Sequence, residues 1–249
     1  MARQPRLVVP SQAHHVVQFA VDRQTIFRDA EDHQCFLNWL RDAAKLYKVA
    51  IHAYVLMPDH VHLAATPADA LGLARMMQWA GRHYVPYFNR KYQRAGTLWQ
   101  GRFKAGVIDA QHYLLLVCRY IETNPVRAGL VVNPQDYAWS SYNHHVGSKA
   151  DPLVTDHMIY WSLGNTPFQR EAAYKHMAEQ ALTSTELQLV GDSAHKGRVL
   201  GSDAYKNELE RQTNRQVRPG KRGRPRKIEP LSIQKVNDIV INANNLLCP

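Results

Sequence analysis

The chain has 249 residues, of which 45% are hydrophobic and 21% are charged. This length can bury a proper core and this composition excludes wholesale disorder, so we expect one full domain with a smaller appendage. The formal net charge of +10 predicts a polyanionic partner, either a nucleic acid or an anionic membrane surface.

The excess positive charge lies near the C-terminal end. Residues 211–227 hold eight cations and no acid, and the remaining 23 cations nearly balance the 21 acids. No run of about 20 apolar residues occurs, and residues 1–10 lack the apolar core of a secretion signal. We therefore expect a cytoplasmic, nucleoid-associated protein with no membrane partner. The three cysteines are far apart and indicate packing residues, not a zinc site or a disulfide framework.

Strand and helix signals alternate along the first half of the chain. Valine-rich and aromatic runs indicate strands, and apolar residues at a helical period indicate helices. Pro58 and Asp59 form a turn pair between two strand-like runs, and Pro86 should kink or divide a long helix. The expected order is a strand at 14–21, a helix at 29–48, a hairpin of 50–57 and 60–65, a helix from 68 to about 92, a strand at 97–109 and a helix at 110–123. This order predicts an α+β fold, a ferredoxin-like antiparallel sheet with packed helices.

The strand signal fades beyond Trp139. Helical patterns follow at 168–182, 185–195 and 202–213, the last with Ser202 as a possible N-cap. We therefore divide the chain into a sheet domain and three further segments: residues 1–148, a helical C-terminal region at 149–210, a basic tail at 211–228, and a segment at 229–249 to which no role is assigned.

His60 and His62 are the first candidates for chemistry. On a strand their spacing points both imidazoles to the same face, where they can share a cation. Thirteen histidines in a chain of this length would produce such a triplet by chance about once. The alternative interpretation, histidines satisfied in a core or hairpin, therefore stays open at this point.

Tyr120 and Asn124 are four residues apart near the end of an expected helix, so they would share one face. An asparagine amide oxygen suits Mg²⁺ or Mn²⁺, and a phenol beside a metal-bound phosphodiester is a competent nucleophile. Two observations oppose this interpretation. Pro125 disfavours helical geometry at Asn124, and helical tyrosines, such as Tyr113 one heptad earlier, usually pack.

Several motifs in order resemble those of HUH transposases with one tyrosine, in particular the REP-associated tyrosine transposases. They are MPDHVHL (57–63), TLWQGRFKAGVID (97–109), RYIETNPVRAGLV (119–131) and WSSY (139–142). The resemblance covers most of residues 12–145 and implies that residues 1–148 are the catalytic domain. It implies that His60 and His62 bind Mg²⁺ or Mn²⁺, that Asn124 occupies the third ligand position, and that Tyr120 attacks DNA. Relatives include both monomers and homodimers.

The implied function is a metal-dependent single-stranded DNA endonuclease and strand transferase, a transposase that forms a 5′-phosphotyrosine on repetitive hairpin DNA. The main alternative is a domesticated, non-catalytic protein that binds DNA hairpins. A rolling-circle replication initiator is disfavoured because no P-loop is present, and a metal-dependent hydrolase would not need Tyr120. The chain departs from the family's pattern at three positions, Phe19, Ala20 and Asp59, which puts DNA contacts or full activity in doubt.

Basic and aromatic residues near the motifs are candidates for DNA contacts. We expect phosphate contacts, or ordinary surface charges, at Arg102, Lys104, Arg119 and Arg127. Trp99 and Phe103 could stack on unpaired bases, although core packing is the commoner role.

The basic tail contains a short motif that resembles an AT-hook. Its arginines could enter a narrow A·T minor groove, or the tail could bind any phosphate backbone. The candidate residues are Arg222, Arg224 and Arg226.

Overall fold

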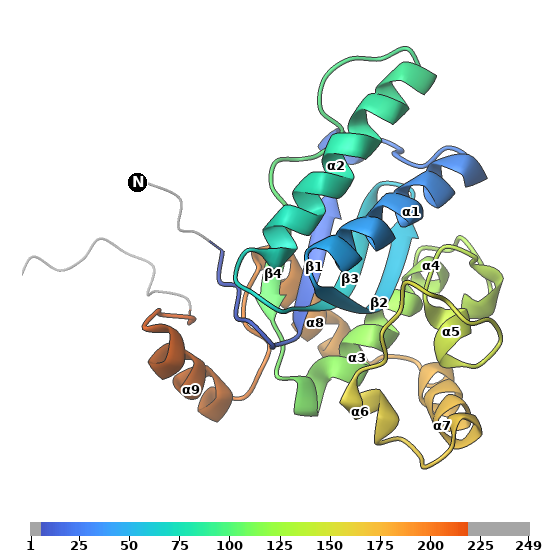
Figure 1. The fold of residues 1–249 in the computed structure, drawn as a ribbon. Helices are drawn as coiled ribbons and strands as arrows, with labels where there is room; N and C mark the ends of the chain where they lie inside the picture. Colours follow the sequence, from blue (N-terminus) through green and yellow to red (C-terminus); the bar gives the residue numbers. More distant parts are fainter. Residues whose placement is uncertain (1–5, 219–249) are drawn as a thin grey trace, which may run out of the picture. The chain divides into compact units, whose positions relative to one another are not determined.

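The computed structural model describes residues 6–218. Its centre is a four-stranded antiparallel sheet with the strand order β2-β3-β1-β4 (Figure 1). All six residues of β1 are buried, because its side chains pack in apolar clusters on both faces of the sheet. The strands are β1 (His14–Phe19), β2 (Val49–Met57), β3 (His60–Pro67) and β4 (Lys104–Val107).

Helices α1 (Ala30–Leu46) and α2 (Gly72–Lys91) pack together on one face of the sheet (Figure 1). Asp29 caps α1 by accepting a hydrogen bond from the Asp32 amide. The order β1-α1-β2-β3-α2-β4 is the ferredoxin-like arrangement, so the predicted α+β fold is confirmed.

The opposite face of the sheet packs against α3 (Ala110–Glu122) and α8 (Ser184–Lys196). A second apolar cluster fills this side, with Val55 and Ala64 of the sheet against Leu114, Val117 and Ile121 of α3. The remaining elements are α4 (Asn124–Arg127), α5 (Tyr142–His145), α6 (Met158–Trp161), α7 (Pro167–Glu179), α9 (Asp203–Thr213) and the 3-10 turns Val21–Arg23 and Pro134–Asp136.

The hairpin of β2 and β3 is confirmed, with Met57 paired to His60 across a two-residue turn. The expected strand at 97–109 is wrong in its extent, because β4 begins only at Lys104. The backbone before it turns at Gly101, where φ is 67°, and crosses the end of β1, where Gln100 N–H donates to the Phe19 carbonyl. Pro86 lies inside α2 without dividing it. Within residues 6–218 no helix is long and apolar enough to cross a membrane.

Candidate active site

The face of the sheet that packs on α3 and α8 carries a cluster of histidines. In the strand register Phe19 pairs with His60 and Val17 with His62. Because directly paired residues lie on the same face and alternate residues share a face, this register also places His15 beside His62. The ring centroids of His60 and His62 are 4.9 Å apart. The predicted common face of the two histidines is therefore present.

His60 lies between Asp59 and Asn124. Its Nδ1 is 2.5 Å from a carboxylate oxygen of Asp59, and its Nε2 is 3.2 Å from the Asn124 amide nitrogen. The hydrogen bond from His60, with help from Arg23 at 3.2 Å, holds the pKa of Asp59 below its usual value. An ionised Asp59 accepts the Nδ1–H of His60, so the lone pair of Nε2 points toward Asn124.

His62 is buried and bonded to another histidine. Its Nδ1 lies 2.9 Å from Nε2 of His15, and Nδ1 of His15 is buried without a partner. Burial first, and then the neighbouring His15 and His60, hold the pKa of His62 well below its usual value. Burial likewise lowers the pKa of His15 to about 3. Both rings are therefore neutral at physiological pH, as metal ligation by an imidazole requires.

Tyr120 projects from α3 against this cluster. Its ring centroid lies 5.9 Å from that of His62 and 6.0 Å from that of His15, both with edge-on geometry. A methyl group at Gly191 of α8 would approach the Tyr120 hydroxyl to 3.4 Å. Within residues 6–218 this hydroxyl makes no hydrogen bond. The phenol is thus fixed by packing at its ring while its oxygen is left for another partner.

The two arginines nearest Tyr120 are already engaged with the protein. Arg127 lies with its Cζ 4.5 Å from the Tyr120 ring centroid and donates 2.6 Å hydrogen bonds to the Tyr120 carbonyl and the Thr123 hydroxyl. Arg119 donates to the carbonyl of Gln180 at 2.7 Å. Arg127 therefore positions the tyrosine, and Arg119 ties α3 to the end of α7.

Phe19, one of the departures from the family's pattern, forms part of the site. Its ring lies 5.5 Å from the ring of His60 and stacks on His195 of α8 at 5.1 Å. Nζ of Lys104 lies 5.4 Å from the centroid of the Phe19 ring. Lys104 therefore brings a positive charge to the edge of the histidine cluster. Ala20, the second departure, is buried in the core between the sheet and α1 and α2.

Arg102 lies apart from this cluster. It is exposed and lines two pockets at the β4 edge of the sheet, together with Phe103, and Trp99 lines one of them. The AT-hook candidates Arg222, Arg224 and Arg226 lie outside the described residues.

Sequence reasoning missed three contributors, His15, Gly191 and His195. The contacts of His15 depend on the pairing of β1 with β3, which no local pattern reveals. Gly191 and His195 reach the site only because α8 packs on the sheet and α3. The second histidine of the HHVVQF run was the one available signal, since a buried strand seldom holds a histidine without a partner.

No group of three or more histidine, cysteine, aspartate or glutamate side chains suited to a metal occurs between residues 6 and 218. The candidate donor set at this site is instead two imidazoles and one amide. A mixed set of nitrogen and oxygen donors can hold a divalent metal ion.

Comparison with known proteins shows which family this part of the chain resembles. Residues 8–124 match the family model described as "Transposase IS200 like". This matched region is similar to IS200-like transposases. The resemblance predicted from the motifs is thereby confirmed, and the matched region includes all of the sheet, the histidine cluster, Tyr120 and Asn124. No curated protein matches the chain.

Two solved structures resemble parts of this chain. One is a REP-associated tyrosine transposase bound to a REP hairpin, with 18% identity, a TM-score of 0.48 and coverage of 64% of this chain and 93% of the other. The second is a crystal structure assigned to a transposase of Deinococcus radiodurans R1, with 22% identity, a TM-score of 0.35 and coverage of 49% and 97%.

Proposed function

We propose that the chain is a metal-dependent transposase that nicks single-stranded DNA and transfers the strand through a covalent bond to Tyr120. The main support is the convergence of His60, His62 and Asn124 beside the Tyr120 ring on one face of the sheet. We propose residues 1–148 as the catalytic domain, with the helical region at 149–210 and the basic tail at 211–228 adding contacts to repetitive hairpin DNA.

The proposed metal ligands are His60, His62 and Asn124. Nε2 of His60 and the amide of Asn124 face each other at 3.2 Å. Because the two ends of an amide occupy equivalent positions, a flip of the Asn124 amide brings its oxygen to the place where its nitrogen now lies. When bound, Mg²⁺ or Mn²⁺ would polarise the scissile phosphate and stabilise the charge that develops on it.

Asp59 and His15 would orient the two imidazole ligands. Asp59 accepts the Nδ1–H of His60, and His15 can accept the Nδ1–H of His62. Each acceptor then leaves the lone pair of the ligand's Nε2 available. Partners of this kind fix the tautomer and the ring orientation of metal-binding histidines.

Tyr120 would act as the nucleophile. In the proposed step its phenolic oxygen attacks the phosphorus, the bond from oxygen to phosphorus forms, and the phenol proton leaves to water. The bond to the 3′-oxygen breaks, and this oxygen takes up a proton. The products are a 5′-phosphotyrosine and a free 3′-hydroxyl. Attack by the 3′-hydroxyl of another DNA end reverses the step, so strand transfer requires no external energy source.

Positive charges at the edges of the site would hold the DNA backbone. Lys104 lies beside Phe19 and Arg102 lies farther along the same sheet edge. Arg119 and Arg127 have guanidinium donors beyond those used for Gln180, Tyr120 and Thr123. These four residues are the proposed phosphate contacts of the catalytic domain.

The test is the formation of a covalent adduct by the full chain. The protein is incubated with Mn²⁺ and labelled single-stranded DNA from a pool of hairpins with randomised flanks, and adducts that survive denaturing electrophoresis are counted. We expect adducts with the wild type and none with Tyr120→Phe. Tyr113→Phe, which alters another partly buried tyrosine of α3, is the matched control and should behave as the wild type.

Each other outcome assigns a different function. Cleavage by Tyr120→Phe at the wild-type rate would indicate a hydrolase. Hairpin binding without cleavage by the wild type under all metal conditions would indicate a non-catalytic hairpin-binding protein.

A further inference from the structure

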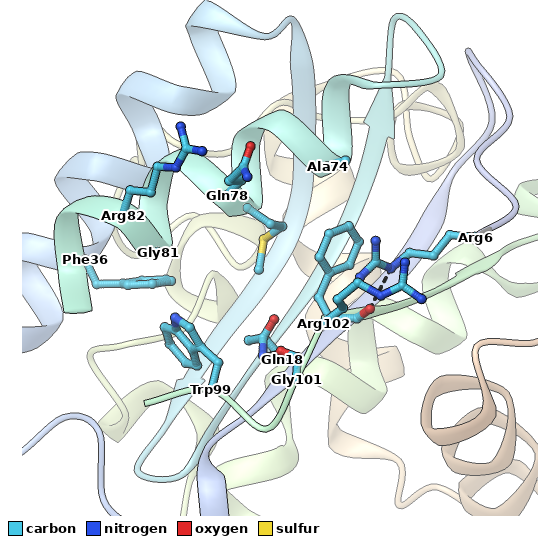
Figure 2. Close-up of a pocket in the computed structure, with 12 residues that line it drawn as sticks. Arg6, Gln18, Phe36, Ala74, Gln78, Gly81, Arg82, Trp99, Gly101 and Arg102 are labelled. Carbon is cyan, nitrogen blue, oxygen red and sulfur yellow. Dashed lines mark hydrogen bonds between the residues drawn. The ribbon is translucent and has the colours of Figure 1, made fainter. Parts of the chain in front are cut away.

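A pocket of about 450 Å³ opens on the α1 and α2 side of the sheet, behind the catalytic face (Figure 2). Its walls are largely aromatic and apolar and include Phe36 of α1, Gly81 of α2, and Trp99 and Phe103 from the segment that precedes β4. No aspartate or glutamate lines it. The proposed chemistry makes no use of this pocket, whose volume lies in the range of small-molecule sites.

The pocket and the catalytic face are back to back across β1. Phe19 packs on His60, and the neighbouring residue Gln18 points to the other face and lines the pocket. The same alternation holds at β4, where Lys104 lies against Phe19 while Phe103 lines the pocket. β4 is the edge strand of the sheet, and Gly197 and Arg198 pack against its outer side, so a DNA strand that passes from one face to the other would follow the groove between these segments.

A basic groove follows that edge. A second pocket of about 300 Å³ runs along β4 and shares Arg6, Arg102 and Phe103 with the first. No acidic residue lines it, and its six cations are Arg6, Arg102, Lys104, Lys196, Arg198 and Arg215. Cations arranged in this way match the repeated negative charges of a phosphodiester backbone.

Two cations at the aromatic pocket are not engaged with the protein. Arg82 of α2 and Arg102 are exposed, and neither forms a hydrogen bond or an ion pair with another residue of the described part of the chain. Their guanidinium groups are therefore available for the phosphates on either side of a base that enters the pocket.

Two amides line the pocket, that of Gln78, which is exposed, and that of Gln18, which is buried. The Gln18 amide nitrogen donates to the carbonyls of Gly101 at 3.3 Å and Phe19 at 3.4 Å, which fixes the orientation of this amide. The Gln18 amide oxygen points into the pocket, on the side of the Trp99 ring (Figure 2). The pocket thus offers a fixed acceptor, the Gln18 oxygen, between apolar walls, an arrangement that suits the face and the donor edge of a nucleobase.

We propose that this pocket binds one unpaired base of the DNA strand whose cleavage is proposed above, with the flanking phosphates in the basic groove along β4. The proposal rests on the proposed function for the identity of the strand. A paired base cannot enter, because its face and its hydrogen-bonding edge are already occupied in the duplex. The pocket therefore favours single-stranded over duplex DNA next to the active site.

The test measures DNA binding without cleavage. The full chain with Tyr120→Phe is titrated, in EDTA, into a fluorescein-labelled random 20-mer, either single-stranded or annealed to its complement, and anisotropy is recorded. Adding Trp99→Ala should weaken binding of the single strand about tenfold, the usual effect of removing a stacking partner. Binding of the duplex should change less than twofold. Trp161→Ala, which removes an exposed tryptophan of α6 outside the pocket, is the matched control.

Two further variants test the pocket if Trp99→Ala does not fold. Ala74→Leu fills the pocket from α2 and should act like Trp99→Ala. Arg102→Ala should weaken both DNA forms, whereas Arg90→Ala, an exposed cation of α2 outside the pocket, should weaken neither. If folded Trp99→Ala or Ala74→Leu binds the single strand within twofold of its parent, or weakens both DNA forms equally, the pocket does not bind a base. Because no cleavage is measured, this result is independent of the covalent adduct assay.

Discussion

Helix α3 carries two clusters of polar side chains that differ in how completely they are hydrogen-bonded. Glu122 is fully buried, and its two carboxylate oxygens accept hydrogen bonds from Ser141, His145 and Tyr174. Tyr120, two residues earlier, has a hydroxyl without a partner among residues 6–218, and His15 beside it has a buried nitrogen without one.

The degree of hydrogen bonding distinguishes residues that stabilise the fold from residues that could take part in the proposed chemistry. A buried polar group without a partner costs stability, and Nδ1 of His15 is such a group. The Glu122 cluster fixes α3 against α5 and α7, while the cluster at Tyr120 keeps donors and acceptors unused. The signature RYIETNP thus holds a residue that stabilises the fold, Glu122, two positions after the proposed nucleophile, Tyr120.

The largest effect is expected on the rate of adduct formation when the site around Tyr120 loses a proposed metal ligand. Asn124→Ala should slow adduct formation about a thousandfold, because metal coordination supplies several kcal/mol of charge stabilisation. The measurement is the single-turnover rate of adduct formation in Mn²⁺. Asn133→Ala is the control, since it removes an exposed hydrogen bond to Asp136 outside the site. An Asn124→Ala rate within fivefold of the wild type would remove Asn124 from the ligand set.

Loss of Glu122, whose cluster is fully hydrogen-bonded, should lower the free energy of unfolding. Glu122→Ala leaves His145, Ser141 and Tyr174 without their buried acceptor, and we expect the free energy of unfolding to fall by about 3 to 5 kcal/mol. Urea denaturation measures this change. Tyr120→Phe, on the same helix, should change the unfolding free energy by less than about 0.5 kcal/mol. Equal losses for the two variants would contradict the distinction between the clusters.

Two buried histidines outside these clusters predict how the stability of the fold depends on pH. His14 and His52 have both ring nitrogens hydrogen-bonded in the neutral form, and burial lowers the pKa of each to about 4. A lowered histidine pKa means that the unfolded chain binds protons first, so stability is complete above about pH 6.5 and falls as the pH drops toward 4. At pH 5 each residue should cost about 2 kcal/mol.

Urea midpoints measured between pH 5 and 7 test this prediction, with His52→Gln as the comparison. The variant should have a shallower pH dependence than the wild type. Parallel curves for the two proteins would show that His52 does not contribute.

The smallest effect is expected for the residue that orients a ligand. His15→Phe should weaken Mn²⁺ binding about 10- to 100-fold by removing the hydrogen-bond partner of His62. Isothermal titration calorimetry gives the affinity without any need for activity, and His15→Gln, which restores an acceptor, should recover part of it. His83→Phe, an exposed histidine of α2, is the control. Unchanged affinity in His15→Phe would leave His15 a packing residue.

The sequence predicted the parts of this molecule that depend on local patterns. The hairpin around Pro58 and Asp59 and the common face of His60 and His62 follow from turn chemistry and strand alternation. The strand expected from Thr97 was too long, because alternating residues there wrap over the end of β1 and do not pair in β4. Nor could the contacts of His15 be predicted, since they depend on the register between strands far apart in the chain.

The central claim is that Tyr120 forms the covalent bond to DNA. Its most direct test is mass spectrometry of the adduct formed in Mn²⁺, after nuclease digestion of the DNA and proteolysis of the protein. The account predicts a nucleotide mass on the peptide that contains Tyr120, with fragmentation placing it on that tyrosine. A nucleotide on any other residue, or DNA cleavage without a modified peptide, would contradict the account.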